Sequence, residues 1–216
     1  MKIAVMGTGS AGRALGTKLA GLGHEVMMGS RTADNENAVE WAEGAGDDAS
    51  HGTFADAAAF GELIVNCTAG GASVEALRSA GAANLAGKTL IDVANPLDFS
   101  RGRPPTLLFC NTESLGERIQ DEFPDARVVK SLNTMNAAVM VDPGVVSGDH
   151  DVFVCGNDAE AKQQVVELLE SFGWPSENIV DLGDISSARG TEMYLPLWLR
   201  LWSALGSGEF NIHAVR

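Results

Sequence analysis

KIAVMGTGSAG, residues 2–12, is the stretch that decides the fold of this 216-residue chain. Its first five residues have the apolar character of a strand, and a helical pattern follows in which Leu15, Leu19 and Leu22 share one face. A second strand-like run, residues 25–28, completes a βαβ unit. We therefore expect a strand, a tight turn and a helix to open an α/β fold of the Rossmann type.

The turn between this strand and this helix has the glycine spacing GxGxxG of a dinucleotide-binding site. Gly7 would permit the tight turn, Gly9 the approach of a pyrophosphate, and Gly12 the close packing of helix on strand. Amides of the first helical turn and the positive end of the helix dipole would hold the phosphates. A glycine-rich turn without a ligand is the alternative, because this spacing also arises by chance in a chain with 25 glycines.

The end of the second strand distinguishes NADP from NAD. An NAD-binding fold usually carries Asp or Glu there, which binds the 2′-hydroxyl of the ribose. This chain has Gly29-Ser30-Arg31-Thr32 instead, with no carboxylate before Asp34. Arg31 can pair with a 2′-phosphate and stack on adenine, and the hydroxyls of Ser30 and Thr32 can donate to the same group. The pattern predicts NADP(H); a solvated surface arginine is the alternative.

Composition excludes several other classes of function. The chain is 45% hydrophobic and has a formal net charge of −14, which argues against a nucleic-acid or anionic-membrane partner. Its most apolar segment is interrupted by Pro196 and Arg200, and no signal peptide is visible. Three widely spaced cysteines and four unclustered histidines indicate neither a disulfide framework nor a metal site. We expect a soluble, cytoplasmic protein.

Strand-like runs and helical stretches alternate along the rest of the chain. The runs typical of strands are 2–6, 25–29, 63–67, 89–93, 127–132, 151–155 and 178–182, and helices are expected over 34–44, 72–80, 113–122 and 159–172. Such alternation predicts a doubly wound, mostly parallel sheet with helices on both faces. We divide the chain into an NADP-binding domain, residues 1–184, and a C-terminal helical segment, residues 185–216.

The C-terminal segment differs in character from the rest. Residues 193–202 are apolar on nearly all sides of a helix, so they should be covered on each side. Packing onto the sheet of the same chain would cover them. A homodimer interface through this helix, or a lid over a flat aromatic ligand, would do so equally well.

Three further loops follow buried-looking strands. Residues 67–71, 94–97 and 130–137 should all lie beside a dinucleotide bound at the carboxyl edge of the sheet. Nothing resembles a hydrolase, because the chain has no GxSxG elbow and no Cys/His arrangement. Lys130 invites comparison with the catalytic lysine of hydroxyisobutyrate-type dehydrogenases. It lies in a strand-like run, however, and the chain lacks their long C-terminal helical domain.

Taken together, these segments resemble the NADPH-dependent reductases of the deazaflavin coenzyme F420 over essentially the full length. The resemblance is carried by the glycine turn and by residues 29–31, 95–97, 128–137 and 195–211. Residues 130–137 are also similar to the oxidoreductase domain of the six-transmembrane ferric reductases. Such a likeness implies a Rossmann-type fold, NADP(H) as cofactor and a deazaflavin as co-substrate.

The resemblance also implies roles for individual residues. Thr8 to Ala11 would line the pyrophosphate, Thr68 and Ala69 would approach the ribose, and the Ala137 amide would hold the nicotinamide carboxamide. The full predicted cofactor site is Gly7, Thr8, Gly9, Ser10, Ala11, Gly12, Ser30, Arg31, Thr32, Thr68, Ala69, Asn95, Pro96, Asn133, Met135 and Ala137. Arg189 and Met193 would line the substrate pocket. Hydride transfer by positioning alone needs no catalytic residue and no metal.

Three functions remain open on the sequence. The first is hydride transfer between NADP(H) and the deazaflavin coenzyme F420. The second is an NADPH-dependent reductase of flavins or ferric complexes, as the likeness to the membrane reductases suggests. The third is a non-catalytic protein that binds NADP(H) and reports its redox state to a partner protein.

Overall fold

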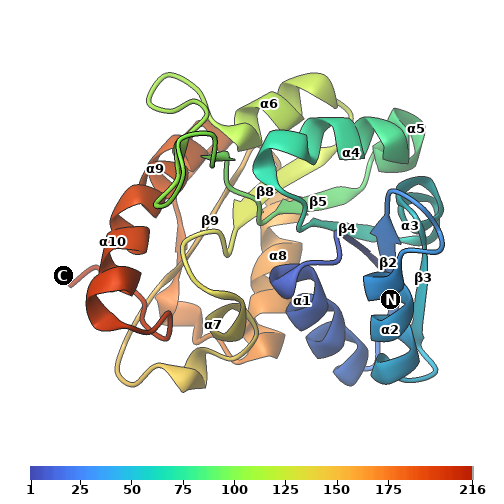
Figure 1. Ribbon diagram of the computed structural model, residues 1–216, viewed down its shortest axis with the longest axis horizontal. Coiled ribbons are helices and arrows are strands. Elements are labelled where there is room, and N and C mark those ends of the chain that lie inside the picture. Colours follow the sequence, from blue (N-terminus) through green and yellow to red (C-terminus); the bar gives the residue numbers. More distant parts are fainter. Residues whose placement is uncertain (216) are drawn as a thin grey trace.

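The computed structural model describes residues 1–215 and places a central sheet between two layers of helices (Figure 1). Within these residues eight strands lie in the order β10-β9-β8-β5-β4-β1-β2-β3. All neighbouring strands run parallel except β8 and β9, which are antiparallel. The predicted doubly wound, mostly parallel sheet is confirmed.

The strands of this sheet are β1 Lys2–Met6, β2 Glu25–Ser30, β3 Ala49–Thr53, β4 Leu63–Asn66, β5 Thr89–Asp92, β8 Arg127–Ser131, β9 Val152–Gly156 and β10 Ile179–Asp181. A separate hairpin pairs β6 Leu97–Asp98 with β7 Thr106–Leu107. The α-helices are α1 Ser10–Gly21, α2 Glu36–Ala45, α3 Phe54–Phe60, α4 Ser73–Ala80, α5 Ala82–Leu85, α6 Leu115–Glu122, α7 Ala137–Val141, α8 Ala159–Phe172, α9 Ala188–Met193 and α10 Leu195–Leu205.

All seven strands expected from the sequence are present, but two features of the sheet region were missed. β3 has the sequence Ala-Ser-His-Gly-Thr, which lacks the apolar alternation that marks a strand and has only one β-branched residue, Thr53. It pairs only with β2 at the edge of the sheet. The β6–β7 hairpin was not predicted either; residues 101–105 lie in the loop that connects its two strands.

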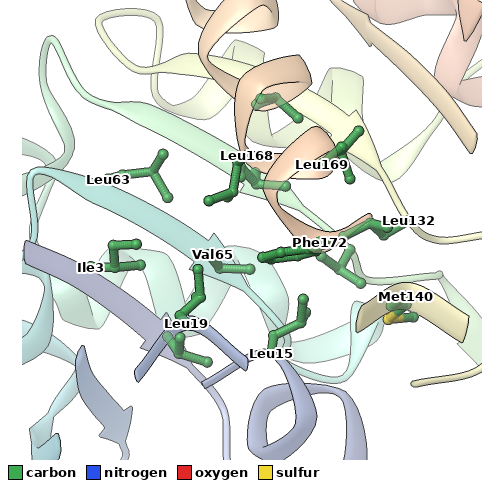
Figure 2. Packing of buried hydrophobic residues seen from close by; sticks show 14 of the residues in the cluster. Ile3, Leu15, Leu19, Leu63, Val65, Leu132, Met140, Leu168, Leu169 and Phe172 are labelled. Carbon is green, nitrogen blue, oxygen red and sulfur yellow. The ribbon is translucent and has the colours of Figure 1, made fainter. Parts of the chain in front are cut away.

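The hydrophobic core is divided by the sheet. Figure 2 shows one half, in which Leu15 and Leu19 of α1 and Phe172 of α8 pack with Val65 of β4. Helices α2 and α7 add to the same half. Helices α3, α4, α5, α6 and α9 cover the opposite face. Both faces of the central strands are thereby buried, as parallel strands require.

Polar side chains cap the α-helices α2, α3, α6, α7 and α8. Asp158 accepts from the Ala161 amide at the start of α8, and Gly173 ends that helix with φ of 106°, as its spacing predicts. Helix α1 is different, because its N-cap is Gly9, no side chain caps it, and its first turn contains no acidic residue. The first amides of α1 therefore have no intrahelical or side-chain acceptor.

The C-terminal helix α10 lies at the end of the molecule away from β2 and β3 (Figure 1). Leu195 is its only buried residue, whereas Leu197 and Leu205 are 56% and 60% exposed. Trp198 stacks on Phe210 of the C-terminal tail, with ring centroids 5.5 Å apart. Packing within the chain thus covers only one side of this helix, and a homodimer through it stays a prediction. No helix within residues 1–215 has the length and apolar character needed to cross a bilayer.

Candidate functional site

The turn between β1 and α1 leaves no room for side chains at two of its three glycines. Gly7 has φ of 112°, and a Cβ added to it would lie 2.8 Å from the Cys67 carbonyl oxygen. A Cβ on Gly12 would lie 2.0 Å from the Gly7 carbonyl oxygen. A Cβ on Gly9 would meet nothing within 4 Å, so this position faces open space. These three environments match the tight turn, the packing contact and the ligand approach expected from the spacing.

A cleft of about 530 Å³ opens over this turn. Its lining residues are Gly7, Thr8, Gly9, Ser30, Arg31, Asn35, Phe54, Cys67, Thr68, Ala69, Ala72, Glu75, Ala76 and Ser79. Seven of the predicted cofactor residues are therefore brought together along one wall. Sequence reasoning missed the opposite wall, which comes from Phe54 after the unrecognised strand β3 and from the start of α4. Ser10, Ala11 and Gly12 continue from the turn as the first residues of α1.

Positive charge at the end of β2 is available to a ligand. Arg31 is exposed, lines the cleft and makes no salt bridge with any residue in 1–215. Ser30 is buried, and its hydroxyl donates to the Thr32 carbonyl, which fixes the turn that presents Arg31. The acidic side chain in this cleft, Glu75, is within 3.5 Å of the Arg78 guanidinium. The geometry therefore suits a 2′-phosphate at Arg31.

Next to this cleft, residues at the carboxyl ends of three neighbouring strands form a buried polar row. Asn66 of β4, Asp92 of β5 and Lys130 of β8 lie side by side in register. The Asn66 amide donates to Asp92 Oδ1 at 2.8 Å, and the Lys130 ammonium contacts Asp92 Oδ2 at 2.7 Å. Burial alone would lower the pKa of Lys130, but the carboxylates of Asp92 and Glu192 outweigh it and raise that pKa. The ammonium form of Lys130 is thus favoured at this edge of the sheet.

The loops that follow these strands are hydrogen-bonded to the polar row and contact one another. Thr68 donates its hydroxyl to Asn66 Oδ1 at 2.7 Å. Asn95 and Asn133 exchange hydrogen bonds of 2.8 and 3.0 Å, and Pro96 follows in the same loop. A Cβ on Gly70 would lie 2.0 Å from the Asn95 carbonyl oxygen, so the loop that contains Ala69 rests directly on the loop after β5. The structure therefore assembles the predicted residues after β4, β5 and β8 at one place.

Two predicted residues lie where the chain turns into α7. Met135 is 5% exposed and belongs to the hydrophobic core, so its side chain faces inward. Ala137 is the first residue of α7, which Asn136 caps by accepting from the Val139 amide at 3.0 Å. Helix α7, which begins at Ala137, packs beside α1 (Figure 1).

The two predicted substrate-pocket residues lie on α9 and outside the 530 Å³ cleft. Arg189 binds Glu117 of α6 through Nε, at 2.8 and 3.1 Å, and through Nη2. That pairing holds the pKa of Glu117 below its usual value. Met193 is 40% exposed. Nη1 of the Arg189 guanidinium takes no part in these contacts with Glu117, and the expected role of Arg189 in a substrate pocket stays a prediction.

Glu192, between these two residues, was not predicted. It is 2% exposed, and its Oε1 contacts the Lys130 ammonium at 2.7 Å. Its carboxylate also accepts from the amides of Leu115 and Gly116 at the start of α6, at 2.8 and 3.1 Å. One sequence signal could have found it, because Glu192 is the only acidic residue between Asp184 and Glu209 and borders the apolar run.

The described residues of the site form no metal-binding cluster and no activated thiol. Within the described part of the chain no three His, Cys, Asp or Glu side chains gather to hold a metal ion. Burial raises the pKa of the Cys67 thiol, which disfavours the thiolate that a nucleophile needs. Hydride transfer without a catalytic side chain stays a prediction.

Known proteins share this arrangement. Residues 2–96 match the family described as NADP oxidoreductase, coenzyme F420-dependent. The F420-dependent NADP reductase of Methanothermobacter marburgensis is 30% identical over 212 residues, which cover 93% of this chain and 92% of that protein. A crystal structure from Arthrobacter sp. FB24, described as a candidate F420-dependent NADP-reductase, matches with 55% identity and a TM-score of 0.95 over the whole of both chains.

Two further similar proteins are longer than this chain, which covers only part of each. Metalloreductase STEAP3 of Rattus norvegicus is 29% identical over 201 residues, which cover 91% of this chain but only 38% of that protein. A reductive aminase from Aspergillus terreus, solved with NADPH4, cyclohexanone and allyl amine, is 19% identical with a TM-score of 0.66 over 95% of this chain and 62% of that chain, and shows a shared fold alone. The full-length matches determine the assignment: the chain is an NADP-dependent oxidoreductase and belongs to the F420-dependent NADP oxidoreductase family.

Proposed function

We propose that this protein transfers a hydride between NADP(H) and the deazaflavin coenzyme F420. The observation that carries the proposal is a cleft over the glycine turn that is also lined by Arg31, which makes no salt bridge within residues 1–215. Full-length similarity to reductases that are named for both coenzymes supports it. A reaction between two bound coenzymes agrees with a site whose side chains bind and orient.

The described residues fit NADP(H) in three respects. Open space at Gly9 allows a pyrophosphate to approach the backbone. The uncapped start of α1 supplies amides and the positive end of a helix dipole to the phosphates. Arg31, which has no carboxylate partner within residues 1–215, would bind the 2′-phosphate together with the turn held by Ser30.

When bound, the nicotinamide and the deazaflavin supply the hydride donor and acceptor. The chain would hold the nicotinamide end between the loops after β4, β5 and β8, where Thr68, Asn95 and Asn133 meet. Holding two rings in contact accounts for about 7–11 kcal/mol of a barrier through proximity and orientation. The second coenzyme would lie toward α9, where Arg189 and Met193 are partly exposed.

An NADPH-dependent reductase of free flavins or ferric complexes is the second candidate. The similarity to STEAP3, described as a metalloreductase, covers 91% of this chain and favours it. That protein is much longer, since the chain spans 38% of its length. The two candidates share the NADP(H) site and differ only in the electron acceptor.

An anaerobic absorbance assay tests the proposal. The purified protein is mixed with NADPH and oxidised F420, with NADH in place of NADPH as the cofactor control. Loss of the visible deazaflavin absorbance with NADPH, and much less with NADH, is the expected result. No loss of absorbance, with NADPH binding intact, would refute F420 as the acceptor. Turnover with flavin or a ferric chelate would then support the second candidate, and none with any acceptor would support a sensor of NADP(H).

A further inference from the structure

Lys130 is the centre of the buried polar row, and its ammonium contacts three separate segments of the chain. It lies 2.7 Å from Asp92 Oδ2 at the end of β5 and 2.7 Å from Glu192 Oε1 on α9. It also donates to the Ala94 carbonyl in the loop after β5. The side chains of Lys130 and Asp92 are 0% exposed and that of Glu192 is 3% exposed. No solvent or substrate reaches this ammonium directly.

Each contact of Lys130 leads to a predicted cofactor residue. Through Asp92 and Asn66 it is linked to Thr68, the residue expected beside the ribose. Through the Ala94 carbonyl it fixes the loop whose next residue, Asn95, exchanges hydrogen bonds with Asn133. The walls around the nicotinamide end of the site are therefore connected to a single ammonium.

The third contact reaches the C-terminal helices. Glu192 directly precedes Met193, and its carboxylate also accepts from the Leu115 and Gly116 amides of α6. Helix α6 has eight residues, so its amides and dipole compensate the second negative charge of the cluster. The cluster of one ammonium and two carboxylates is thus satisfied without water. It joins the dinucleotide side of the site to the side where a second substrate would bind.

Stability alone does not account for such a cluster. Replacing buried ionic groups by apolar side chains of similar volume is often neutral or stabilising, because their desolvation is costly. What a buried, fully hydrogen-bonded ion cluster provides is a unique geometry, because its charges tolerate no other arrangement. In this chain the cluster fixes the position of the loops after β4 and β5 relative to α9.

We propose that Lys130 is a positioning residue for hydride transfer: it sets the loops that hold the nicotinamide end of NADP(H) and aligns them with α9. It touches neither coenzyme and acts through Asp92, Ala94 and Glu192. The kinetic part of the proposal rests on the proposed function. The part that concerns cofactor binding does not depend on which acceptor the protein uses.

The main test compares Lys130→Met with the matched control Lys162→Met. Lys162 likewise bridges a strand-end carboxylate, Asp181 at 2.8 Å, and a backbone carbonyl, that of Gly183, but it does so at the outer strand β10. Dissociation constants are measured for NADPH and for adenosine 2′,5′-bisphosphate, which contains only the adenine half of the cofactor. We expect Lys130→Met to weaken NADPH about tenfold and the bisphosphate less than about twofold. The control should change neither.

A second variant keeps the test decisive if Lys130→Met does not fold. Glu192→Gln retains the ammonium and its contact with Asp92 but removes one carboxylate and weakens the link to α9. We expect kcat with the acceptor to fall about tenfold while KM for NADPH changes less than about threefold. NADPH should again be weakened more than the bisphosphate.

Equal weakening of NADPH and the bisphosphate would overturn the proposal, because it would indicate general damage to the fold. Unchanged binding and unchanged kcat in both variants would overturn it as well. Failure of F420 reduction by the unmodified protein would refute the proposed function and leave the binding comparison for Lys130 intact. The two proposals therefore fail in distinguishable ways.

Discussion

Replacing Arg31 by alanine is expected to weaken NADPH far more than NADH. Arg31 is exposed, lines the cleft at the end of β2 and makes no salt bridge with any residue in 1–215. Its removal therefore leaves no buried partner unpaired, and the fold should be unaffected. The change acts only on a ligand that carries a negative charge at this point, which NADPH does and NADH does not.

The magnitude follows from the exposure of this side chain. A hydrogen bond to a charged group contributes about 1.5–3 kcal/mol. The Arg31 guanidinium is exposed, and water would also hydrate a phosphate bound to it. We therefore take the lower end of that range for the whole contribution of this side chain. The affinity for NADPH should fall roughly tenfold to thirtyfold, since about 1.4 kcal/mol corresponds to a factor of ten. The affinity for NADH should change by less than about twofold.

The assay is titration of the protein with each cofactor, followed by fluorescence or calorimetry, at one fixed salt concentration. Arg127→Ala is the matched control, because it removes the same charge at the start of β8, on the opposite edge of the sheet. Arg127 has only loose salt bridges of 3.6 and 3.7 Å. An equal loss for NADPH and NADH in Arg31→Ala, or the same loss in Arg127→Ala, would refute the 2′-phosphate role.

Two further predictions follow from the turn and the tail. Gly12→Ala should abolish dinucleotide binding and cost at least about 1–3 kcal/mol of stability in thermal unfolding, because its Cβ would lie 2.0 Å from a carbonyl oxygen. Gly21→Ala, at the open end of the same helix, should leave binding unchanged. Burial opposes ionisation of Asp151, but hydrogen bonds, among them one from the Ala214 amide at 2.7 Å, hold its pKa below 3.8. Because that pKa is depressed in the folded state, Asp151 stabilises the tail fully above pH 3.8 and loses this effect as the pH falls through the folded value. The protection of the Ala214 amide from hydrogen exchange, measured relative to the intrinsic exchange rate at each pH, should therefore fall in acid. Asp151→Asn should remove this acid dependence of the protection; an unchanged profile would contradict it.

Much of the fold and half of the site follow from local sequence. The glycine turn, the switch from strand to helix period around it, and the absence of a carboxylate before Asp34 each depend on residues within a few positions of one another. Such short-range signals depend on backbone conformation and on capping, which are nearly independent of the rest of the chain. For that reason helix α8 has the predicted bounds 159–172. The residues expected at the two ends of an NADP site, the glycine turn and Arg31, line the same cleft in the structure.

The buried row and its link to the C-terminus were decided by tertiary structure alone. Strand order places β5 between β4 and β8, and register brings Asn66, Asp92 and Lys130 into one line. Glu192 joins them from 62 positions further along the chain than Lys130. The exposed side of α10 and the antiparallel β9 likewise depend on which elements become neighbours. The sequence by itself determined which segments form the longer helices and most of the strands. Only the tertiary structure decided which charged side chains are buried together, because that depends on contacts between segments distant in the sequence.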